Sequence, residues 1–368
     1  MKFRCERDAL VDRLSTSSRA VSSRGGALPV LTGIHLSANE DTLTITGSDL
    51  DLTVRSTVTV AVDTPGVAVL PARLTVDIIR SLDSGAVEID ISNDEARISS
   101  GRSQFAVRTL PADDFPKLPE PSGDAVSLSA TDLAGGLRQV VMAASSDDAR
   151  PILTGVLLSS EEGGLRLVAT DSYRLAVRDL PNATVLNEGQ KVLVPSRALG
   201  ELIRVLGDAE TVTVRLGKHD VTFDVPSADG GVQVTTRLIE GEFPNYRQLI
   251  PSSYPNRLVV GREPLLEAVR RVKLMAREAA PLRVTQRADC LELMAVTQDV
   301  GQAHEEVDAI YDGEELTVAF NPDYLIAGVE AALGDEVVLE TLDALKPAVL
   351  RSTDGGDFLY LLMPVRVS

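Results

Sequence analysis

Several kinds of residue are scarce in this sequence. Tryptophan is absent, aromatic residues make up 4% of the 368 positions, and there are two cysteines and three histidines. Cys5 and Cys290 stand far apart and fit neither a disulfide framework nor a metal knuckle, so we expect both to be buried as small apolar side chains. No histidine stands at a metal-ligand spacing from another. The core must therefore be filled by Val, Leu, Ile and Ala, and no metal site is expected.

Long apolar runs are also missing. No window approaches the roughly 20 apolar residues that a membrane-spanning helix needs. The opening MKFRCERDAL has no apolar stretch after its basic residues, as a secretory signal would have. These two absences lead us to expect a cytoplasmic protein with no membrane partner.

Motifs of catalysis are absent too. The sequence contains no GxGxxG, Walker A or GxSxG pattern. Asp49 and Asp51 could form a carboxylate pair, but they stand at a turn between predicted strands and are only partly repeated, at Asp171, which favours a structural role. We expect no cofactor and no enzymatic activity. An enzyme built from scattered residues is the alternative.

What the sequence does contain is one pattern repeated three times. Residues 28–55 and 150–178 both carry a Pro, a Leu-Thr-Gly, two alternating apolar runs around an acidic turn, an Asp and a strand ending in Val-Arg. A weaker copy begins at Pro281. A second landmark, a short strand, a Pro and an amphipathic helix, recurs in VLPARLTVDIIRSL (69–82), VLVPSRALGELIRVL (192–206) and VAFNPDYLIAGVEAAL (318–333).

The repeat predicts an α+β unit of about 120 residues, with two helices and perhaps eight short antiparallel strands. The opening helices are predicted at Glu6–Arg24, Thr131–Ser145 and Arg262–Glu278. The Pro-rich ends of the repeats place the domains at 1–122, 123–252 and 253–368. The pattern is compatible with a gene duplication without functional meaning, but repetition of a whole domain also suggests a pseudo-symmetric arc or ring.

Six motifs in order carry a resemblance that covers the whole chain. They are MKF at the start, VLPAR (69–73), SGRSQFAVRTLPADDFP (100–116), VATDSYRLAV (168–177), FPNYRQLIP (243–251) and MPVR (363–366). With the triplicated unit beneath them, the chain resembles the bacterial DNA polymerase III beta subunit, the sliding clamp. The resemblance implies three clamp domains and a head-to-tail homodimer, a closed ring that encircles duplex DNA. It also implies binding of the replicative polymerase, the clamp loader and other proteins through a short peptide.

Charge bears on the DNA prediction. The formal net charge of −18 by itself argues against nucleic-acid binding, but the predicted helices together carry +3, and the resemblance places these helices around the hole. It implies DNA-binding roles for Arg24, Arg73, Arg138, Arg197 and Arg204. Any of these arginines could equally be a solvated residue on a polar helix face. Weak phosphate contacts suit a ring, because topology then replaces affinity and no base needs to be read.

A partner-peptide groove is the second implied site. In the family it lies between the second and third domains and accepts peptides of the Gln-Leu-x-Leu-Phe kind. The matching positions are Arg150, Leu153, Thr170, Ser172, Tyr173, Arg174, Leu175, Pro244, Leu249, Asn321, Tyr324, Pro347, Met363, Pro364, Val365 and Arg366. Leu, Met and Pro supply the adaptable apolar walls that such a groove needs. For Leu153, Leu175 and Leu249 the alternative is a place in the ordinary core.

The chain departs from the family pattern near this groove. Ser172-Tyr173 replaces a Gly-His pair seen in other members, and Gln248 replaces a residue that is basic in some. Pro151 and Ile152 stand where some members carry aromatic residues that touch DNA. We therefore expect a different partner preference and assign no DNA contact to the loop at 150.

Ring closure is implied as well. The resemblance brings the first domain's Leu82, Arg97 and Arg102 against Leu274, Met275, Glu305 and Glu306 of a second chain. Opposite charges would set the register. The competing interpretation of the whole pattern is a monomeric tandem-repeat scaffold unrelated to DNA.

Overall fold

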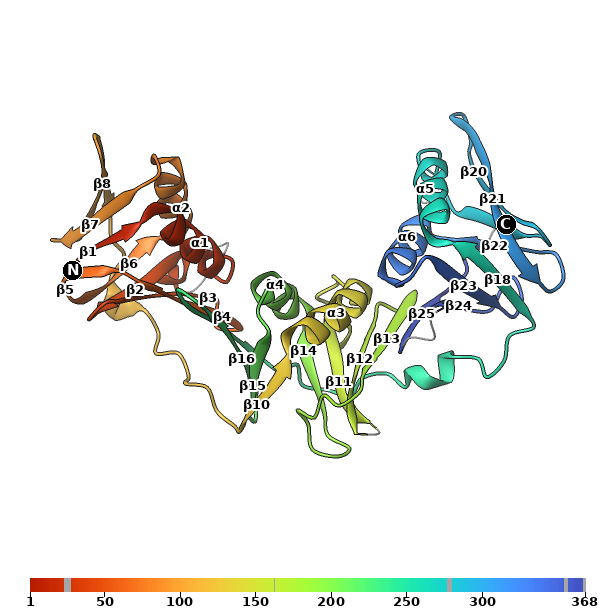
Figure 1. Ribbon diagram of the computed structural model, residues 1–368, viewed down its shortest axis with the longest axis horizontal. Coiled ribbons are helices and arrows are strands. Elements are labelled where there is room, and N and C mark those ends of the chain that lie inside the picture. Colours follow the sequence, from red (N-terminus) through yellow and green to blue (C-terminus); the bar gives the residue numbers. More distant parts are fainter. Residues whose placement is uncertain (23–27, 162, 277–279, 354–356, 367–368) are drawn as a thin grey trace. The chain divides into compact units, whose positions relative to one another are not determined.

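The computed structural model describes residues 1–22, 28–161, 163–276, 280–353 and 357–366. Within these ranges one order of elements recurs three times: a strand, a helix, four or five strands, a second helix and three strands (Figure 1). The helices are α1 (Arg7–Ser18), α2 (Ala72–Ser81), α3 (Ala130–Val140), α4 (Ser196–Leu206), α5 (Arg262–Lys273) and α6 (Pro322–Ala331). The predicted triplicated α+β fold is confirmed.

The chain forms two compact units. The first comprises residues 1–134 and 197–238, and the second comprises 135–196 and 239–368. Each unit thus combines one terminal repeat with part of the central one.

The first unit contains two antiparallel sheets. One has the order β5 (Ala61–Thr64), β1 (Lys2–Glu6), β7 (Ala86–Ser92), β8 (Glu95–Ser100), β9 (Ser103–Arg108). The other has the order β10 (Ala125–Ser129), β15 (Thr211–Leu216), β16 (Asp220–Ser227), β17 (Gly230–Arg237), β4 (Leu52–Thr59), β3 (Thr42–Ser48), β2 (Gly33–Asn39), β6 (Gly66–Pro71). In the second sheet, strands of the first repeat continue directly into strands of the central one.

The second unit contains a continuous twelve-stranded sheet. Its order is β14 (Lys191–Pro195), β11 (Gly155–Glu161), β12 (Gly164–Thr170), β13 (Arg174–Leu180), β25 (Phe358–Leu362), β24 (Ala348–Ser352), β23 (Glu336–Thr341), β18 (Asn256–Gly261), β21 (Gly301–Asp312), β20 (Cys290–Thr297), β19 (Leu282–Gln286), β22 (Leu316–Phe320). Short 3-10 turns η1 (Pro29–Thr32) and η4 (Pro151–Thr154) precede β2 and β11, and η5 (Tyr246–Leu249) lies in the connection before β18.

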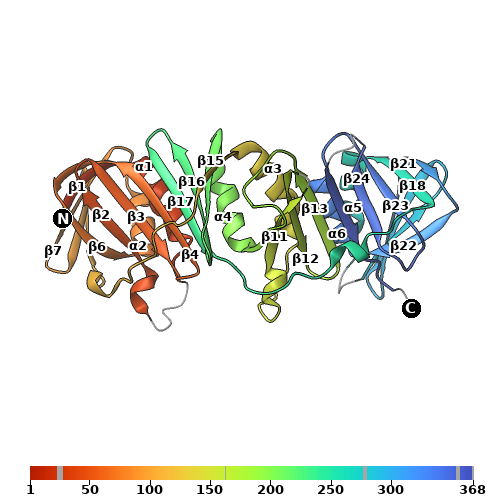
Figure 2. The same ribbon diagram turned by 90° about the horizontal axis from the view of Figure 1, so that it is seen from below.

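Helices cover one face of the sheets. In the first unit α1 packs on β3, β4 and α2, and Figure 2 shows β2, β3 and β4 side by side with these helices behind them. Leu10 and Leu14, one helical turn apart, are 1% exposed and face the core together with Phe3 of β1. Burying each such side chain contributes roughly 1.5–3 kcal/mol, so the apolar stripe decides which face of α1 meets the sheet.

Three predicted helix ends are wrong. The first helix stops at Ser18 instead of Arg24, α3 ends at Val140 and passes into a 3-10 turn instead of reaching Ser145, and α5 stops at Lys273 instead of Glu278. At the end of α1 the hydroxyl of Ser17 donates to the Ile45 carbonyl across 3.0 Å, which ties the last turn to β3.

Strand pairing joins the repeats at two equivalent places. In the first unit β4 pairs antiparallel with β17, with Val54 opposite Val234. In the second unit β13 pairs antiparallel with β25, with Ala176 opposite Tyr360. We call these pairings the first and second junctions. Both use the same two strands of the repeat, so neighbouring domains are joined by backbone hydrogen bonds.

Two expectations from scarce residues can be compared with the structure. Cys5 is a buried free thiol as expected, but Cys290 is only partly buried, so that part of the expectation is wrong. In the described part of the chain, no helix has the length and apolar character needed to cross a bilayer.

Candidate functional site

Asp171 organises the turn between β12 and β13. Its Oδ1 accepts the backbone N–H groups of Tyr173 and Arg174 across 2.9 and 3.0 Å. Ser172, at the tip, has φ of 82°, in the left-handed region that favours glycine. The carboxylate therefore has a structural role here, in which it fixes the direction of the two side chains that follow it.

Arg174 connects this turn to α6. Its Nε donates to Oδ2 of Asp171 across 2.9 Å, and its guanidinium carbon lies 4.4 Å from the centroid of the Tyr324 ring. Tyr173 stacks near the same ring, with centroids 6.4 Å apart. Burial raises the pKa of Tyr324. An arginine and two tyrosines of the predicted groove thus form one contact group.

The start of α6 is held from two sides. Asn321 caps the helix, its side chain accepting the N–H groups of Asp323 and Tyr324, so this predicted groove residue has a structural task as well. The hydroxyl of buried Tyr360 donates to the Tyr324 carbonyl across 2.9 Å. At Gly328 a Cβ would lie 2.4 Å from the Tyr360 ring, so only glycine lets α6 approach this closely.

The C-terminal residues lie across the end of β13. The N–H of Met363 donates to the Tyr173 carbonyl across 2.9 Å, and the N–H of Val365 donates to the Ala319 carbonyl across 2.7 Å. Leu362 pairs with Ala348, so Pro347 stands next to the pair that precedes Met363. The segments at 173, 347 and 363–365 therefore meet.

Arg150 reaches the same turn from η4. Its guanidinium donates to Asp147 across 2.9 Å and to the Ser172 hydroxyl across 3.3 Å. Thr170 supports the turn from within, because its hydroxyl donates to the Arg174 carbonyl across 2.6 Å. Arg150 is therefore placed at the edge of the site with its charge already partly neutralised.

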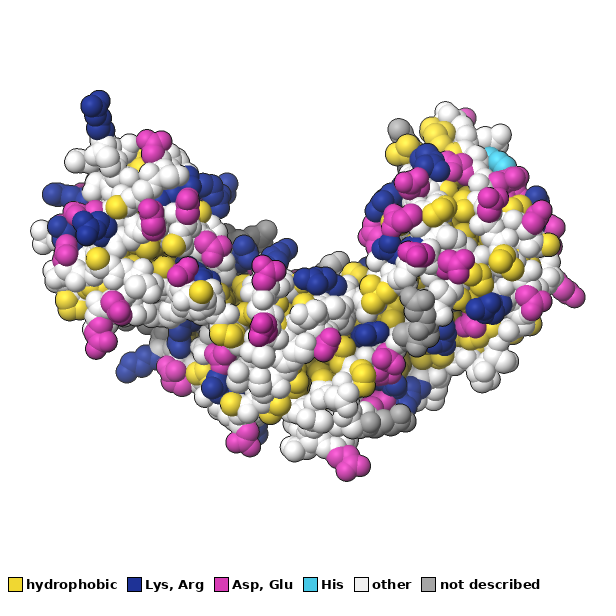
Figure 3. All heavy atoms as spheres, viewed as in Figure 1, with side chains coloured by type: hydrophobic (Ala, Val, Ile, Leu, Met, Phe, Trp, Pro, Cys, Tyr) yellow, Lys and Arg dark blue, Asp and Glu magenta, His cyan; other side chains and the backbone are white. Residues whose placement is uncertain are grey.

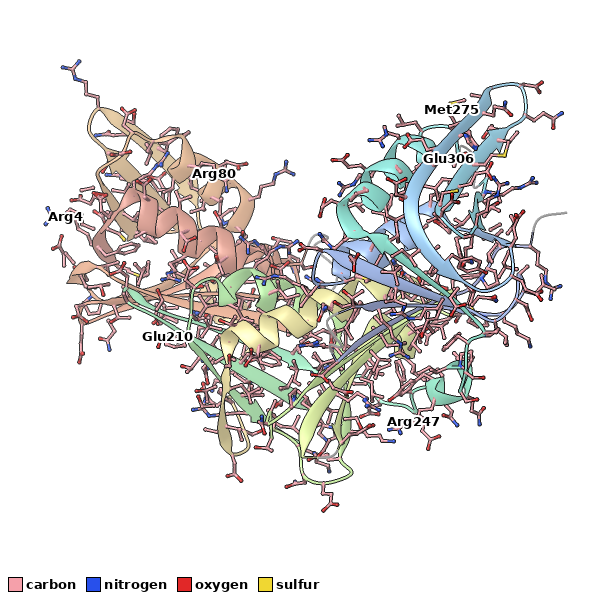
Figure 4. All side chains as sticks on the ribbon, turned by 45° about the vertical axis from the view of Figure 1, so that its right-hand side comes forward. Arg4, Arg80, Glu210, Arg247, Met275 and Glu306 are labelled. Atoms are coloured by element: carbon pink, nitrogen blue, oxygen red, sulfur yellow. The ribbon has the colours of Figure 1, made fainter. Side chains whose placement is uncertain are left out.

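The connection that carries Pro244 and Leu249 packs beside this group. Tyr246 belongs to a buried core cluster that includes Leu175, and Phe243, Ile250 and Met363 pack against this cluster. Arg247 of η5, labelled in Figure 4, forms an ion pair with Glu161. Pro244 and Leu249 are both exposed, Leu249 to 41%.

The structure separates wall residues from core residues. Tyr173 (59% exposed) and Val365 (37%) offer surface to a ligand. Leu175 is fully buried and Leu153 is 8% exposed, so the core alternative holds for these two. Two residues were missed by sequence reasoning. Tyr360 supports Tyr324 from below, and Leu345, 67% exposed in a turn capped by Asp343, stands two residues before Pro347.

The predicted DNA-binding arginines differ in how free they are. Arg73 is 97% exposed and lies 4.0 Å from Asp77. Arg138 is exposed, and among the described residues no ion pair includes it. Arg204 pairs with Glu201, and Arg197 pairs with Asp49 while donating to the Arg19 carbonyl across 3.3 Å. Arg24 lies outside the described residues.

Positive charge on the third repeat's helices is largely matched by acids. Figure 3 shows basic and acidic side chains intermixed over α5 and α6. The ion pairs are Arg262–Glu263, Arg270–Glu330, Arg271–Glu267, Arg271–Glu305 and Lys273–Asp323. The helix α1, shorter than predicted, is neutral, since two arginines face two aspartates within it. The expected concentration of positive charge is therefore weaker than the sequence suggested.

The predicted ring-closing residues also separate into two groups. Leu274 is 72% exposed, and Met275 (labelled in Figure 4) lies where the end of α5 approaches the start of β21, its Cε 3.1 Å from the Cβ position of Gly301. Arg271 holds Glu305 by two bonds of 2.7 and 2.8 Å and lowers the pKa of that carboxyl. Arg271, Glu305 and Glu306 line an open hollow of about 650 Å³ between α5 and β21.

On the first domain, Leu82 is 5% exposed and belongs to its own core, so it offers little surface to another chain. Arg97 and Arg102 are exposed, the former 3.3 Å from Glu95. Phe105 on β9, 38% exposed, lies between Arg102 and Arg108 on the same edge and offers apolar surface there.

In the described residues no group of three His, Cys, Asp or Glu side chains could hold a metal ion.

Three tandem strand–helix units joined edge to edge by β-strands, with an aromatic site at the second junction that the C-terminal residues cross, define a protein of the DNA-clamp class. Residues 1–119, 127–245 and 247–366 match the N-terminal, central and C-terminal domains of the DNA polymerase III beta subunit. The chain belongs to this family, the bacterial beta sliding clamps.

Relatives agree over the full length. The chain is 32% identical to the beta sliding clamp of Streptomyces coelicolor and 33% identical to that of Staphylococcus aureus, covering 100% of this chain and 99–100% of each relative. The crystal structure of the Bacillus subtilis sliding clamp matches with a TM-score of 0.90 at 31% identity, with both chains fully covered. A processivity clamp of this family is an accessory subunit of DNA polymerase III and has no catalytic activity of its own.

Proposed function

We propose that two copies of this chain close head to tail into a ring, with β9 of one copy pairing with β21 of the other. The single observation that carries this proposal is the repetition of the strand junction. The first junction pairs the fourth strand of one repeat with the last strand of the next, and so does the second. The fourth strand of the third repeat, β21, and the last strand of the first repeat, β9, take part in neither junction. Over 301–308, β21 pairs only with β20 among the described strands, and β9 is the last strand of its sheet.

The repeat also supplies a register for this third pairing. Phe105 is equivalent in the first repeat to Val234 in the second and Tyr360 in the third. Each of the three lies in the last strand of its repeat and pairs with a central residue of the strand before it. Its predicted partner is Ala303, which corresponds to Val54 and Ala176. The same register sets Arg102 opposite Glu306.

Charge and apolar surface support this register. Arg102 and Glu306 are both exposed, while Glu305 is occupied by Arg271. Exposed Phe105 and Leu274 supply apolar surface on the two sides, and Met275 flanks the start of β21, since its Cε lies 3.1 Å from the Cβ position of Gly301. Buried apolar contacts would stabilise the interface, and the opposite charges would set its register. Arg97 and Leu82 support β9 from behind in this proposal.

The ring is proposed to encircle duplex DNA without reading its sequence. Exposed Arg73 and Arg138 would make loose phosphate contacts, with Arg24, Arg197 and Arg204 as further candidates. Each phosphate contact weakens with salt by about 0.9 log unit per log unit of salt concentration, so contacts alone would not hold the protein under cellular conditions. Closure would hold it, because DNA cannot leave sideways.

Retention on nicked circular DNA tests this function. After loading, the protein should stay on the circle in high salt and leave rapidly once the circle is cut. Loss at the same rate from circular and linear DNA would contradict encirclement. The same preparation, measured by light scattering, should have the mass of two chains.

The site at Tyr173, Arg174, Tyr324 and Met363 is proposed to bind short peptides of polymerases, clamp loaders and other partners. Its exposed aromatic and aliphatic side chains suit the Leu-Phe end of a Gln-Leu-x-Leu-Phe peptide.

We further propose domain boundaries at 1–122, 123–252 and 253–368, and a cytoplasmic location, as expected for a protein that acts on the chromosome.

A further inference from the structure

The first junction repeats the backbone of the predicted peptide site. Asp49 accepts the N–H groups of Asp51 and Leu52 across 3.1 and 2.9 Å, the same pattern that Asp171 makes with the two residues at its turn. Leu50 at the tip has φ of 80°, against 82° at Ser172. The two turns are therefore equivalent residue by residue.

The strand that crosses each turn is equivalent too. The N–H of Arg237 donates to the Asp51 carbonyl across 3.0 Å, and the N–H of Met363 donates to the Tyr173 carbonyl across 2.9 Å. Asp51 thus stands where the peptide site has Tyr173, and Arg237 stands where it has Met363.

The side chains at these equivalent positions have opposite character. Tyr173 and Met363 are apolar or aromatic surface, whereas Asp51 and Arg237 are charged, 77% and 69% exposed, and 3.8 Å apart. An exposed pair of this kind adds little stability by itself. Covering it with a Leu or Phe side chain is costly, because both charges would lose their water without gaining a new partner.

A second ion pair holds the turn in this state. The guanidinium of Arg197, on α4, binds Oδ2 of Asp49, the oxygen whose counterpart on Asp171 binds Arg174. The turn of the first junction is therefore held through its aspartate as that of the peptide site is, although the arginine comes from α4 in one and from the turn itself in the other.

We propose that Asp51 and Arg237 exclude apolar partner peptides from the first junction, which confines recognition to one site per chain. This inference rests on the proposed function of the second junction. Asp51 and Arg237 are specificity-determining residues: they act by making the wrong site unfavourable, while Tyr173 and Met363 make the right site favourable.

Grafting tests the inference. The variant Asp51→Tyr/Arg237→Met gives the first junction the side chains of the second. Titration calorimetry with a Gln-Leu-Ser-Leu-Phe peptide should show one site per wild-type chain and two per grafted chain, the new one about ten- to a hundredfold weaker because its other walls are unchanged. The matched control Asp51→Asn/Arg237→Gln keeps polar groups there and should bind one peptide.

A photo-crosslinking form of the peptide locates the second site independently of stoichiometry. In the graft it should label residues near 49–53 as well as near 173 and 363, and in the wild type only the latter. A graft that retains the wild-type melting temperature and mass but binds one peptide overturns the inference, as does a wild-type chain that binds two. A wild-type chain that binds none overturns the proposed peptide function, and this inference with it.

Discussion

Arg174 stacks on Tyr324 across the second junction, with 4.4 Å between the guanidinium carbon and the ring centroid. The two residues come from different repeats, and the arginine is only 15% exposed. The contact therefore both closes the junction and shapes the surface of the proposed peptide site.

Arg174→Ala should lower the free energy of unfolding by about 2–4 kcal/mol, because it leaves Asp171 unpaired and removes the cation–π contact. Peptide binding should weaken at least tenfold, since Tyr173 and Tyr324 lose their support. Urea unfolding and calorimetry measure the two effects. Exposed Arg257→Ala on β18 is the control, and an equal effect in both variants would contradict this role.

Ser172→Gly should stabilise the protein by about 0.5–1 kcal/mol, because glycine adopts a φ of 82° without the strain of a side chain. Thermal unfolding is the measurement. Ser99→Gly on β8 serves as the comparison, where glycine should destabilise the strand. Equal losses at both positions would show that the turn is not strained.

Tyr254→Phe should raise the free energy of unfolding by about 1 kcal/mol at neutral pH, because the Tyr254 hydroxyl is buried without a partner among the described residues. Burial also raises the pKa of Tyr254 to about 12. In the unfolded chain the phenol ionises near its ordinary pKa of 10, whereas in the folded protein it stays neutral up to about pH 12. The free energy of unfolding of the wild type is therefore unaffected by this group below pH 10 and falls as the pH rises from 10 toward 12. The variant should therefore lose less stability than the wild type between pH 10 and 12, and identical alkaline profiles would contradict this.

Arg73→Ala and Arg138→Ala should each reduce the salt dependence of DNA binding by about 0.9 in the slope of log affinity against log salt. Arg204→Ala should change the slope less, because Glu201 already neutralises that arginine. Fluorescence anisotropy with a short duplex over a range of salt concentrations provides the slopes. Three equal reductions would mean that the Arg204 pair breaks when DNA binds.

Phe105→Ala should weaken the proposed dimer by about tenfold or more, because truncation removes a central apolar anchor. Sedimentation at falling protein concentration measures the dissociation constant. Val67→Ala on β6, also an exposed apolar residue, should leave it unchanged. An unaltered dimer in the Phe105 variant would exclude the β9–β21 pairing.

The triplicated fold could be predicted because its signals are local. Pro29 and Pro151 precede the same Leu-Thr-Gly and the same alternating strands, and alternation with a period of two specifies one buried face wherever it occurs. The six family motifs identified the residues of the proposed peptide site, but not which of their side chains are exposed. Helix ends were less well predicted, since the hydroxyl of Ser17 meets Ile45 only after β3 has folded against α1.

Sequence alone therefore determined the repeat, the class of fold and the segments that meet at the proposed peptide site. Tertiary structure decided which side chains remain available. Arg197 looked like a free helix arginine until folding brought it to Asp49, far away in the chain, and Leu175 looked like a groove wall until strand pairing buried it. The physical reason is that periodicity is a property of neighbours along the chain, whereas ion pairing and exposure depend on distant segments that meet only in the folded protein.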